Sequence, residues 1–153
     1  DLSFDMAGYD QVVPNAVQVE IAPHLTVPMV PLPLYVLLKL VAYGDRKEPK
    51  DLGSVLHCLR HYLEESGRRY GLDHDGAPIP FEYTCAYLLG RDAQRFCDRP
   101  IAGSVGIVLD RLDSPDAAVV DIVGREDGLL IVDDEDRTEI FDLFRWFRLG
   151  ASV

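Results

Sequence analysis

Lys39 stands out in the sequence because its surroundings offer no partner for its charge. It is the only charged residue between Pro31 and Gly44. An ammonium group in such an apolar segment must extend to water, pair with a carboxylate or bind an anionic ligand. Tyr35, Lys39 and Tyr43 are spaced four residues apart, so a helix places them on one face. The spacing predicts a stripe of polar-tipped side chains around a single cation.

Arg46 and Asp51 follow this stripe in the sequence and supply the next charges. Arg46 continues the same face if the helix runs that far, and Asp51 lies at the start of the next predicted helix. Lysine is a compact charge suited to phosphate, and the arginine guanidinium is a planar fork suited to phosphate or carboxylate. Either Lys39 and Asp51 form an ion pair that locks two helices together, or the basic side chains bind an anion. On residue types alone we favour the ion pair.

A β element precedes these residues. Residues 17–21 alternate apolar and polar side chains, as a half-buried strand does, and residues 25–30 form a second strand-like run. We expect the two runs to pair as a hairpin, with Pro28 at an edge or a bulge because it cannot donate to a ladder. A two-stranded hairpin is marginal in water, so we expect these strands to complete a larger sheet or to lie against the helices.

The rest of the sequence has the spacing of helices. Apolar residues predict a helix over 34–42 that ends at Gly44, and a second helix over 49–65. The short connection between them indicates an antiparallel pair. Residues 66–80 have the composition of an exposed loop.

Further helices are predicted over 81–89, 92–96, 105–112 and 115–123, with Gly90 separating the first two. Residues 129–132 fit a short strand or a helix tail. A final helix carries the stripe Ile140, Phe141, Phe144 and Phe147, and Gly150 is expected to end it. The predicted fold class is α+β, with a β element over 1–31 and a helical bundle over 32–153.

Length and composition exclude several classes of protein. A chain of 153 residues is long enough for one domain with a substantial core. Its 26 acidic and 15 basic residues give a net charge of −11, the wrong sign for an extended DNA-binding surface. No stretch reaches the ~20 apolar residues of a membrane span. The three cysteines are widely spaced, which is typical of a reducing cytoplasm, where we place the protein.

A longer motif surrounds Lys39. The run from Leu37 to Leu52, L-L-K-L-x-A-x-x-D-R-x-x-x-K-D-L, resembles the segment that follows the catalytic palm in bacterial nucleotidyltransferases of the AbiEii-type toxin group and their minimal-nucleotidyltransferase relatives. Residues 86–92 and 144–150 are similar to later segments of the same proteins. The resemblance implies a DNA polymerase β-like nucleotidyltransferase fold, with this chain as its carboxyl-terminal portion. It also implies a nucleoside triphosphate and Mg²⁺.

The resemblance also implies roles for particular residues. Lys39, Arg46 and Lys50 match basic positions expected to bind the nucleotide, and Asp51 matches a conserved acidic position expected in catalysis. The family motif continues with a second acidic residue, and Ser54 and Val55 stand where it would fall. Asp51 is therefore without its usual companion.

The metal-binding motif of the family is absent from this sequence. That motif is Gly-Ser followed by Asp-x-Asp in a strand context, where paired carboxylates hold the Mg²⁺ ions that bridge the triphosphate. Gly53-Ser54 lies inside a predicted helix, and Gly103-Ser104 leads into one. We assign no metal ligand in this chain and expect the catalytic palm either to lie upstream of Asp1 or to be lost.

Three functions follow from these patterns. The first is transfer of a nucleoside monophosphate from a triphosphate to an acceptor hydroxyl, on RNA or on a protein. The second is a non-catalytic helical module that binds a protein partner such as an antitoxin. The third is metal binding by His57 and His61, which are spaced four residues apart. We rank the third last, because no further ligand stands at a recognisable spacing.

Overall fold

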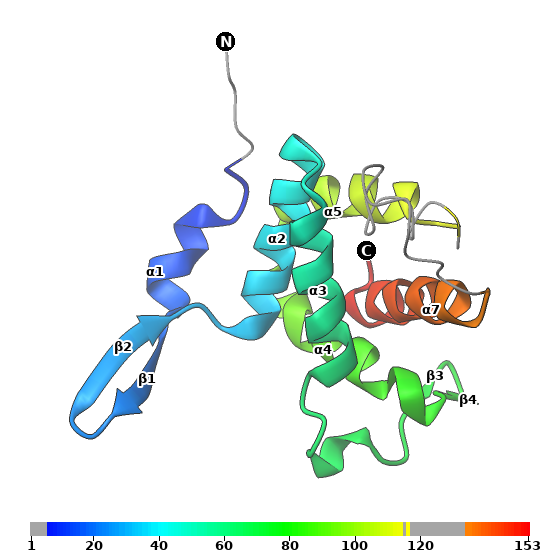
Figure 1. Ribbon diagram of the computed structural model, residues 1–153, viewed down its shortest axis with the longest axis horizontal. Coiled ribbons are helices and arrows are strands. Elements are labelled where there is room, and N and C mark those ends of the chain that lie inside the picture. Colours follow the sequence, from blue (N-terminus) through cyan, green and yellow to red (C-terminus); the bar gives the residue numbers. More distant parts are fainter. Residues whose placement is uncertain (1–5, 115, 117–133) are drawn as a thin grey trace.

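The computed structural model describes residues 6–114, 116 and 134–153. The described chain is mostly helical, with one longer β-hairpin and a bundle of helices (Figure 1). The longer helices and strands are α2 (Leu32–Arg46), α3 (Pro49–His61), α4 (Thr84–Ala93), α5 (Arg99–Arg111), α7 (Asp134–Ala151), β1 (Val17–Ala22) and β2 (Leu25–Met29). The short elements are α1 (Val12–Asn15), β3 (Asp73–His74), β4 (Ala77–Pro78) and the 3₁₀ helices η1 (Tyr9–Gln11), η2 (Gly67–Arg69), η3 (Phe81–Tyr83) and η4 (Gln94–Phe96). This is the predicted combination of a β element and a helical bundle.

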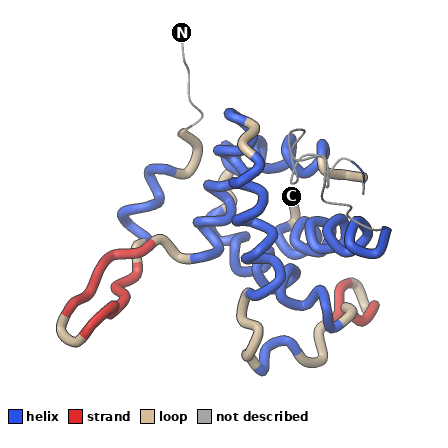
Figure 2. Tube along the Cα trace, in the orientation of Figure 1, coloured by secondary structure: helices blue, strands red, loops and turns tan. Residues whose placement is uncertain are grey.

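The hairpin forms as predicted. Strands β1 and β2 are antiparallel, with Val17 opposite Met29 and Val19 opposite Val27, and the register shifts between Glu20 and Ala22. The hairpin projects from the helices (Figure 2), and every residue of β1 is exposed. The expectation that the strands lie against the helices is therefore wrong. In the described part of the chain its sheet has two strands, so no larger sheet is completed there.

Helices α2 and α3 form the predicted pair and lie side by side (Figure 1). Helix α2 is longer than its apolar pattern indicates, because it continues through Gly44 to Arg46. A Cβ atom at Gly44 would lie 3.3 Å from a methyl group of Val108 on α5, so the glycine allows α2 to approach that helix. The predicted end at Gly44 is wrong. Lys47 ends the helix instead, in the left-handed conformation with φ of 55°.

Glycine has a similar role where α4 crosses α7. Gly90 lies inside α4 and Gly150 lies inside α7, so the predicted break and the predicted stop are both wrong. A Cβ atom on Gly90 would overlap the carbonyl oxygen of Phe147, and one on Gly150 would overlap the carbonyl oxygen of Tyr87. The missing side chains allow the two helix backbones to touch.

The core lies among α2, α3, α4, α5 and α7. Most of the stripe predicted on the last helix is in this core, since Ile140, Phe144 and Phe147 are all buried. Helix α5 covers the predicted range 105–112 except Leu112, and it begins earlier than predicted. It follows Asp98, whose side chain accepts a hydrogen bond from the backbone N–H of Ile101. The elements predicted over 115–123 and 129–132 lie outside the described residues, apart from residue 116.

Alanine substitutions are expected to change stability in opposite directions at a glycine in the contact between α4 and α7 and at a glycine outside it. Gly90→Ala is expected to lower the free energy of unfolding by about 1–3 kcal/mol, because the methyl group forces two backbones apart. Gly103→Ala on α5 is the matched control, because its Cβ would meet no atom within 4 Å. It is expected to raise stability by roughly 0.5–1 kcal/mol through helix propensity. Urea denaturation measures both changes, and a Gly90→Ala protein as stable as the control would contradict the close approach.

Candidate functional site

Asp51 is at the centre of the candidate site. Helix α3 begins at Pro49, whose missing N–H is harmless at a first helical position, so Asp51 falls in the first turn. A negative charge is favoured there by the helix dipole. The side chain of Asp51 is nevertheless 0% exposed, because it faces α2. A buried carboxylate requires partners, and α2 supplies them.

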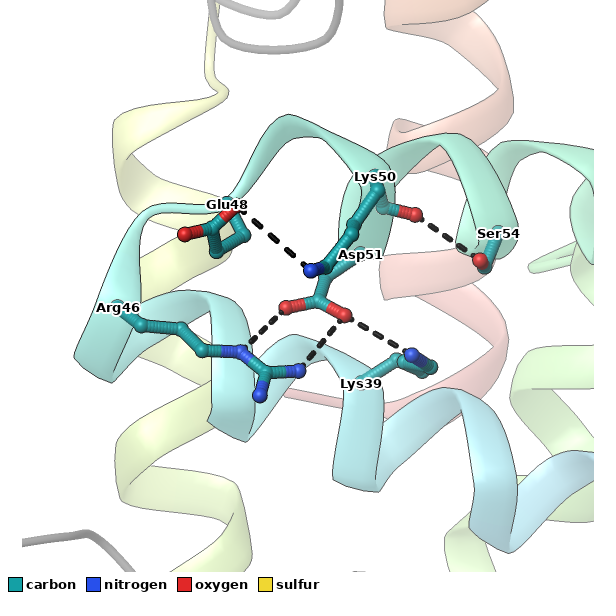
Figure 3. A network of polar contacts seen from close by, with 6 residues as sticks. All are labelled: Lys39, Arg46, Glu48, Lys50, Asp51 and Ser54. Carbon is teal, nitrogen blue, oxygen red and sulfur yellow. Dashed lines mark hydrogen bonds and ion pairs between the residues drawn. The ribbon is translucent and has the colours of Figure 1, made fainter.

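Two cations from α2 hold this carboxylate (Figure 3). Lys39 Nζ donates to Asp51 Oδ1 at 2.9 Å. Arg46 donates through Nε to Oδ2 at 2.8 Å and through Nη2 to Oδ1 at 3.0 Å, a two-pronged contact that fixes the guanidinium plane. The predicted ion pair between Lys39 and Asp51 is confirmed. Arg46 joins it because α2 continues beyond Gly44.

The protonation state of Asp51 follows from two opposing effects. Burial raises the pKa of this carboxyl group, whereas hydrogen bonds from Arg46 and Lys39, together with their positive charges, lower it. The lowering prevails, so the pKa of Asp51 lies below its ordinary value. The hydrogen bond to Asp51 also raises the pKa of Arg46. Two cations and one anion leave this cluster with a net charge of +1.

The cations of the cluster remain accessible, although their partner is not. The side chain of Lys39 is 24% exposed and that of Arg46 is 48% exposed. Bonding to Asp51 uses one of the about three N–H groups of Lys39 and two of the about five N–H groups of Arg46. Both side chains line a small pocket of about 170 Å³, together with Tyr9, Tyr35 and neighbouring apolar residues. Donors on both cations are thus available to a ligand in this pocket.

Tyr9 is the residue of this pocket that the sequence did not reveal. It lies in η1, before the hairpin, in a segment with no clear periodicity. It lines the pocket beside Lys39 and Arg46, which follow it by 30 or more positions in the sequence. No spacing rule connects residues so far apart, so only the tertiary structure could place it here.

Lys50 is separate from the cluster. Its side chain is 73% exposed, and its ammonium group lies 3.9 Å from the carboxylate of Glu48 (Figure 3). Ser54, which stands near the position of the absent second acid, donates to the backbone carbonyl of Lys50. The structure therefore brings together Lys39, Arg46 and Asp51, while Lys50 borders a different and larger pocket.

That larger pocket has a volume of about 650 Å³ and lies along the outer side of α2 and α3. Its walls are mostly apolar, and Tyr35 lines both pockets. His57 and Cys58 lie at its far end from the cation cluster along α3.

The rings of His57 and His61 have centroids 4.7 Å apart, and His61 Nδ1 contacts Glu64 at 3.0 Å. Among residues 6–114, 116 and 134–153 there is no group of three or more side chains able to hold a metal ion.

No protein-family model, curated protein or solved structure matched this chain when it was compared with each. In the described part of the chain, no helix is both long and apolar enough to cross a membrane. The chemistry of the site must therefore be judged from its own geometry.

The buried carboxylate makes stability dependent on pH. Asp51→Asn is expected to lower the free energy of unfolding by about 1–3 kcal/mol at pH 7, because it removes the anion that two cations share. The pKa of Asp51 is depressed in the folded state, so its contribution is fully present above the unfolded value of ~3.9. The contribution is lost as the pH falls below that value. The difference in free energy of unfolding between the unchanged protein and Asp51→Asn should therefore narrow at low pH.

Urea denaturation at pH 7, 5 and 3 measures this difference. Glu139→Gln is a control at pH 7, since Glu139 pairs with Arg60 across α3 and α7 but is 37% exposed. Its loss is expected to lower stability by less than about 1 kcal/mol. If Asp51→Asn has as small an effect as Glu139→Gln, the buried pairing does not stabilise the fold.

Proposed function

We propose that this chain is the nucleotide-binding helical part of a nucleotidyltransferase-like protein, which transfers a nucleoside monophosphate from a triphosphate to an acceptor hydroxyl. The observation that carries the proposal is the pairing of two accessible cations with one buried carboxylate beside a pocket. Such a cluster presents fixed positive charge to a phosphate. The motif that surrounds Lys39 supports the same assignment.

In this proposal Asp51 positions the cations. Its two oxygens already accept three hydrogen bonds and its side chain is out of contact with water. It therefore holds Lys39 and Arg46 at fixed points before the ligand arrives. Donors that are already in place stabilise phosphate charge without reorganising, which is how electrostatic preorganisation contributes to catalysis. Lys50, at the edge of the larger pocket, can add a further and more mobile positive charge.

The described residues do not fit Mg²⁺. Asp51 is buried and accepts hydrogen bonds from Lys39 and Arg46, and the described chain contains no cluster of three metal-ligating side chains. In the proposal, the carboxylates of the palm and the acceptor, an RNA or a protein hydroxyl, are outside the described residues. This chain supplies contacts to the nucleotide.

A second candidate is a non-catalytic module that binds a protein partner such as an antitoxin. The observation that favours it is the apolar face of the hairpin, where Val17, Val19, Ile21, Leu25 and Met29 are each at least 36% exposed. Contiguous apolar surface of this kind marks interaction sites. In this candidate function the Asp51 cluster only joins α2 to α3. A test of triphosphate binding distinguishes the two functions, because only the first requires it.

The proposal predicts that Lys39→Met weakens binding of a nucleoside triphosphate by about 10–100-fold in the presence of Mg²⁺. The reason is the loss of a charged donor to phosphate, worth about 1.5–3 kcal/mol. Methionine keeps most of the apolar stem of lysine, and Arg46 still holds Asp51. Isothermal titration with each of the four ribonucleoside triphosphates measures the affinity.

Arg60→Gln is the matched control for this experiment. It also removes a cation from an interhelical ion pair, that with Glu139, but at a distance from the pocket. Its affinity for the triphosphate should equal that of the unchanged protein. If Lys39→Met is folded and binds the triphosphate equally well, or if the unchanged protein binds none, the protein-binding module becomes the leading function.

A further inference from the structure

The larger pocket, here called the groove, adjoins the small pocket of the cation cluster, because Tyr35 lines both. On α3, Lys50 and Ser54 are four residues apart, as are Gly53 and His57, so the four residues form one stripe facing the groove. Tyr35 lines the opposite side from α2, one helical turn before Lys39. The groove therefore runs along both helices and approaches the cations at Tyr35.

The two ends of this groove differ in chemistry. Lys39 Nζ lies 5.6 Å from the centre of the Tyr35 ring, so the aromatic ring is next to the cation cluster. Beyond it the walls include Met29, Val30 and Leu32, with Ser54 and His57 as polar groups. A ligand that fits both ends has an anionic group joined to a flat or apolar body. The volume of about 650 Å³ lies within the ~300–1,000 Å³ range of small-molecule sites.

We propose that this groove binds the nucleoside part of the nucleotide whose phosphates contact Lys39 and Arg46. The inference rests on the proposed function and deepens it. The base packs on the apolar walls beside Tyr35, since every base has a π-face that stacks on aromatic side chains. Ser54 and His57 supply the hydrogen-bonding groups toward the sugar and base. The positive charge at one end of the groove orients the ligand with its phosphates toward Arg46.

Gly53 provides the means of testing the groove. It lines the pocket, and a Cβ atom there would meet no atom within 4 Å. Gly53→Leu is therefore expected to place its side chain in the groove, and leucine favours the helix more than glycine does. Gly103→Leu on α5 is the matched control, because its Cβ position is equally open and it does not line this pocket.

The experiment compares inorganic tripolyphosphate with the four ribonucleoside triphosphates by isothermal titration, in the presence of Mg²⁺. In the unchanged protein, at least one nucleoside triphosphate should bind about tenfold or more tightly than tripolyphosphate, since stacking on an aromatic ring is worth about 1–3 kcal/mol. Gly53→Leu should remove this advantage and leave tripolyphosphate affinity unchanged. Gly103→Leu should alter neither affinity.

The outcomes distinguish this inference from the proposed function. If tripolyphosphate binds as tightly as the nucleotides, or if Gly53→Leu keeps the nucleoside advantage, the groove is not the nucleoside site, although the phosphate site stands. If neither ligand binds, the proposed function fails and the inference fails with it. Dodecyl phosphate is titrated in parallel. Tighter binding of that amphiphile than of every nucleotide would assign the groove to an acyl chain and overturn the nucleoside site.

Discussion

Asp51 has no contact with water, so its negative charge must be balanced by side chains that reach it inside the protein. This requirement fixes the relation between α2 and α3. Lys39 approaches from the middle of α2 and Arg46 from its last turn, so the carboxylate ties the carboxyl-terminal half of one helix to the first turn of the next. Because α2 continues to Arg46, a second cation reaches this buried anion.

The rest of the bundle supports this pair through close backbone contact. Gly44 allows α2 to approach α5, and Gly90 and Gly150 allow α4 and α7 to touch. Glycine in a helix usually weakens it, because it gains conformational freedom in the unfolded chain. At Gly90 and Gly150 this loss is offset by backbone contact that a Cβ atom would prevent. The pair of helices that carries the cations thus lies on a tightly packed base, while the hairpin projects from it with its apolar face exposed.

A small positive cluster on a protein of net charge −11 is consistent with the compact anionic ligand that we propose. An extended polyanion would meet an acidic protein at many points, whereas the nucleotide that we propose would engage only the pocket at Lys39 and Arg46 and the groove beside Tyr35. The ion pair and the phosphate site are compatible interpretations of the same residues. Asp51 neutralises one of the two positive charges and holds the side chains of Lys39 and Arg46 in place. The cluster keeps one net positive charge, which could attract an anion.

The sequence by itself determined the hairpin, the pairing of two helices and the isolation of Lys39, because these depend on local periodicity and on the types of a few neighbouring residues. It also identified Lys39, Arg46 and Asp51, since they lie within one short segment. It failed at Gly44, Gly90 and Gly150, where local rules predict that a helix ends and contact with a distant helix decides otherwise. Only the tertiary structure brought Tyr9 to the cations, because this contact depends on packing between segments far apart in the chain. It also separated Lys50 from the cations and opened the groove along α3, because both depend on which face of α3 packs against α2.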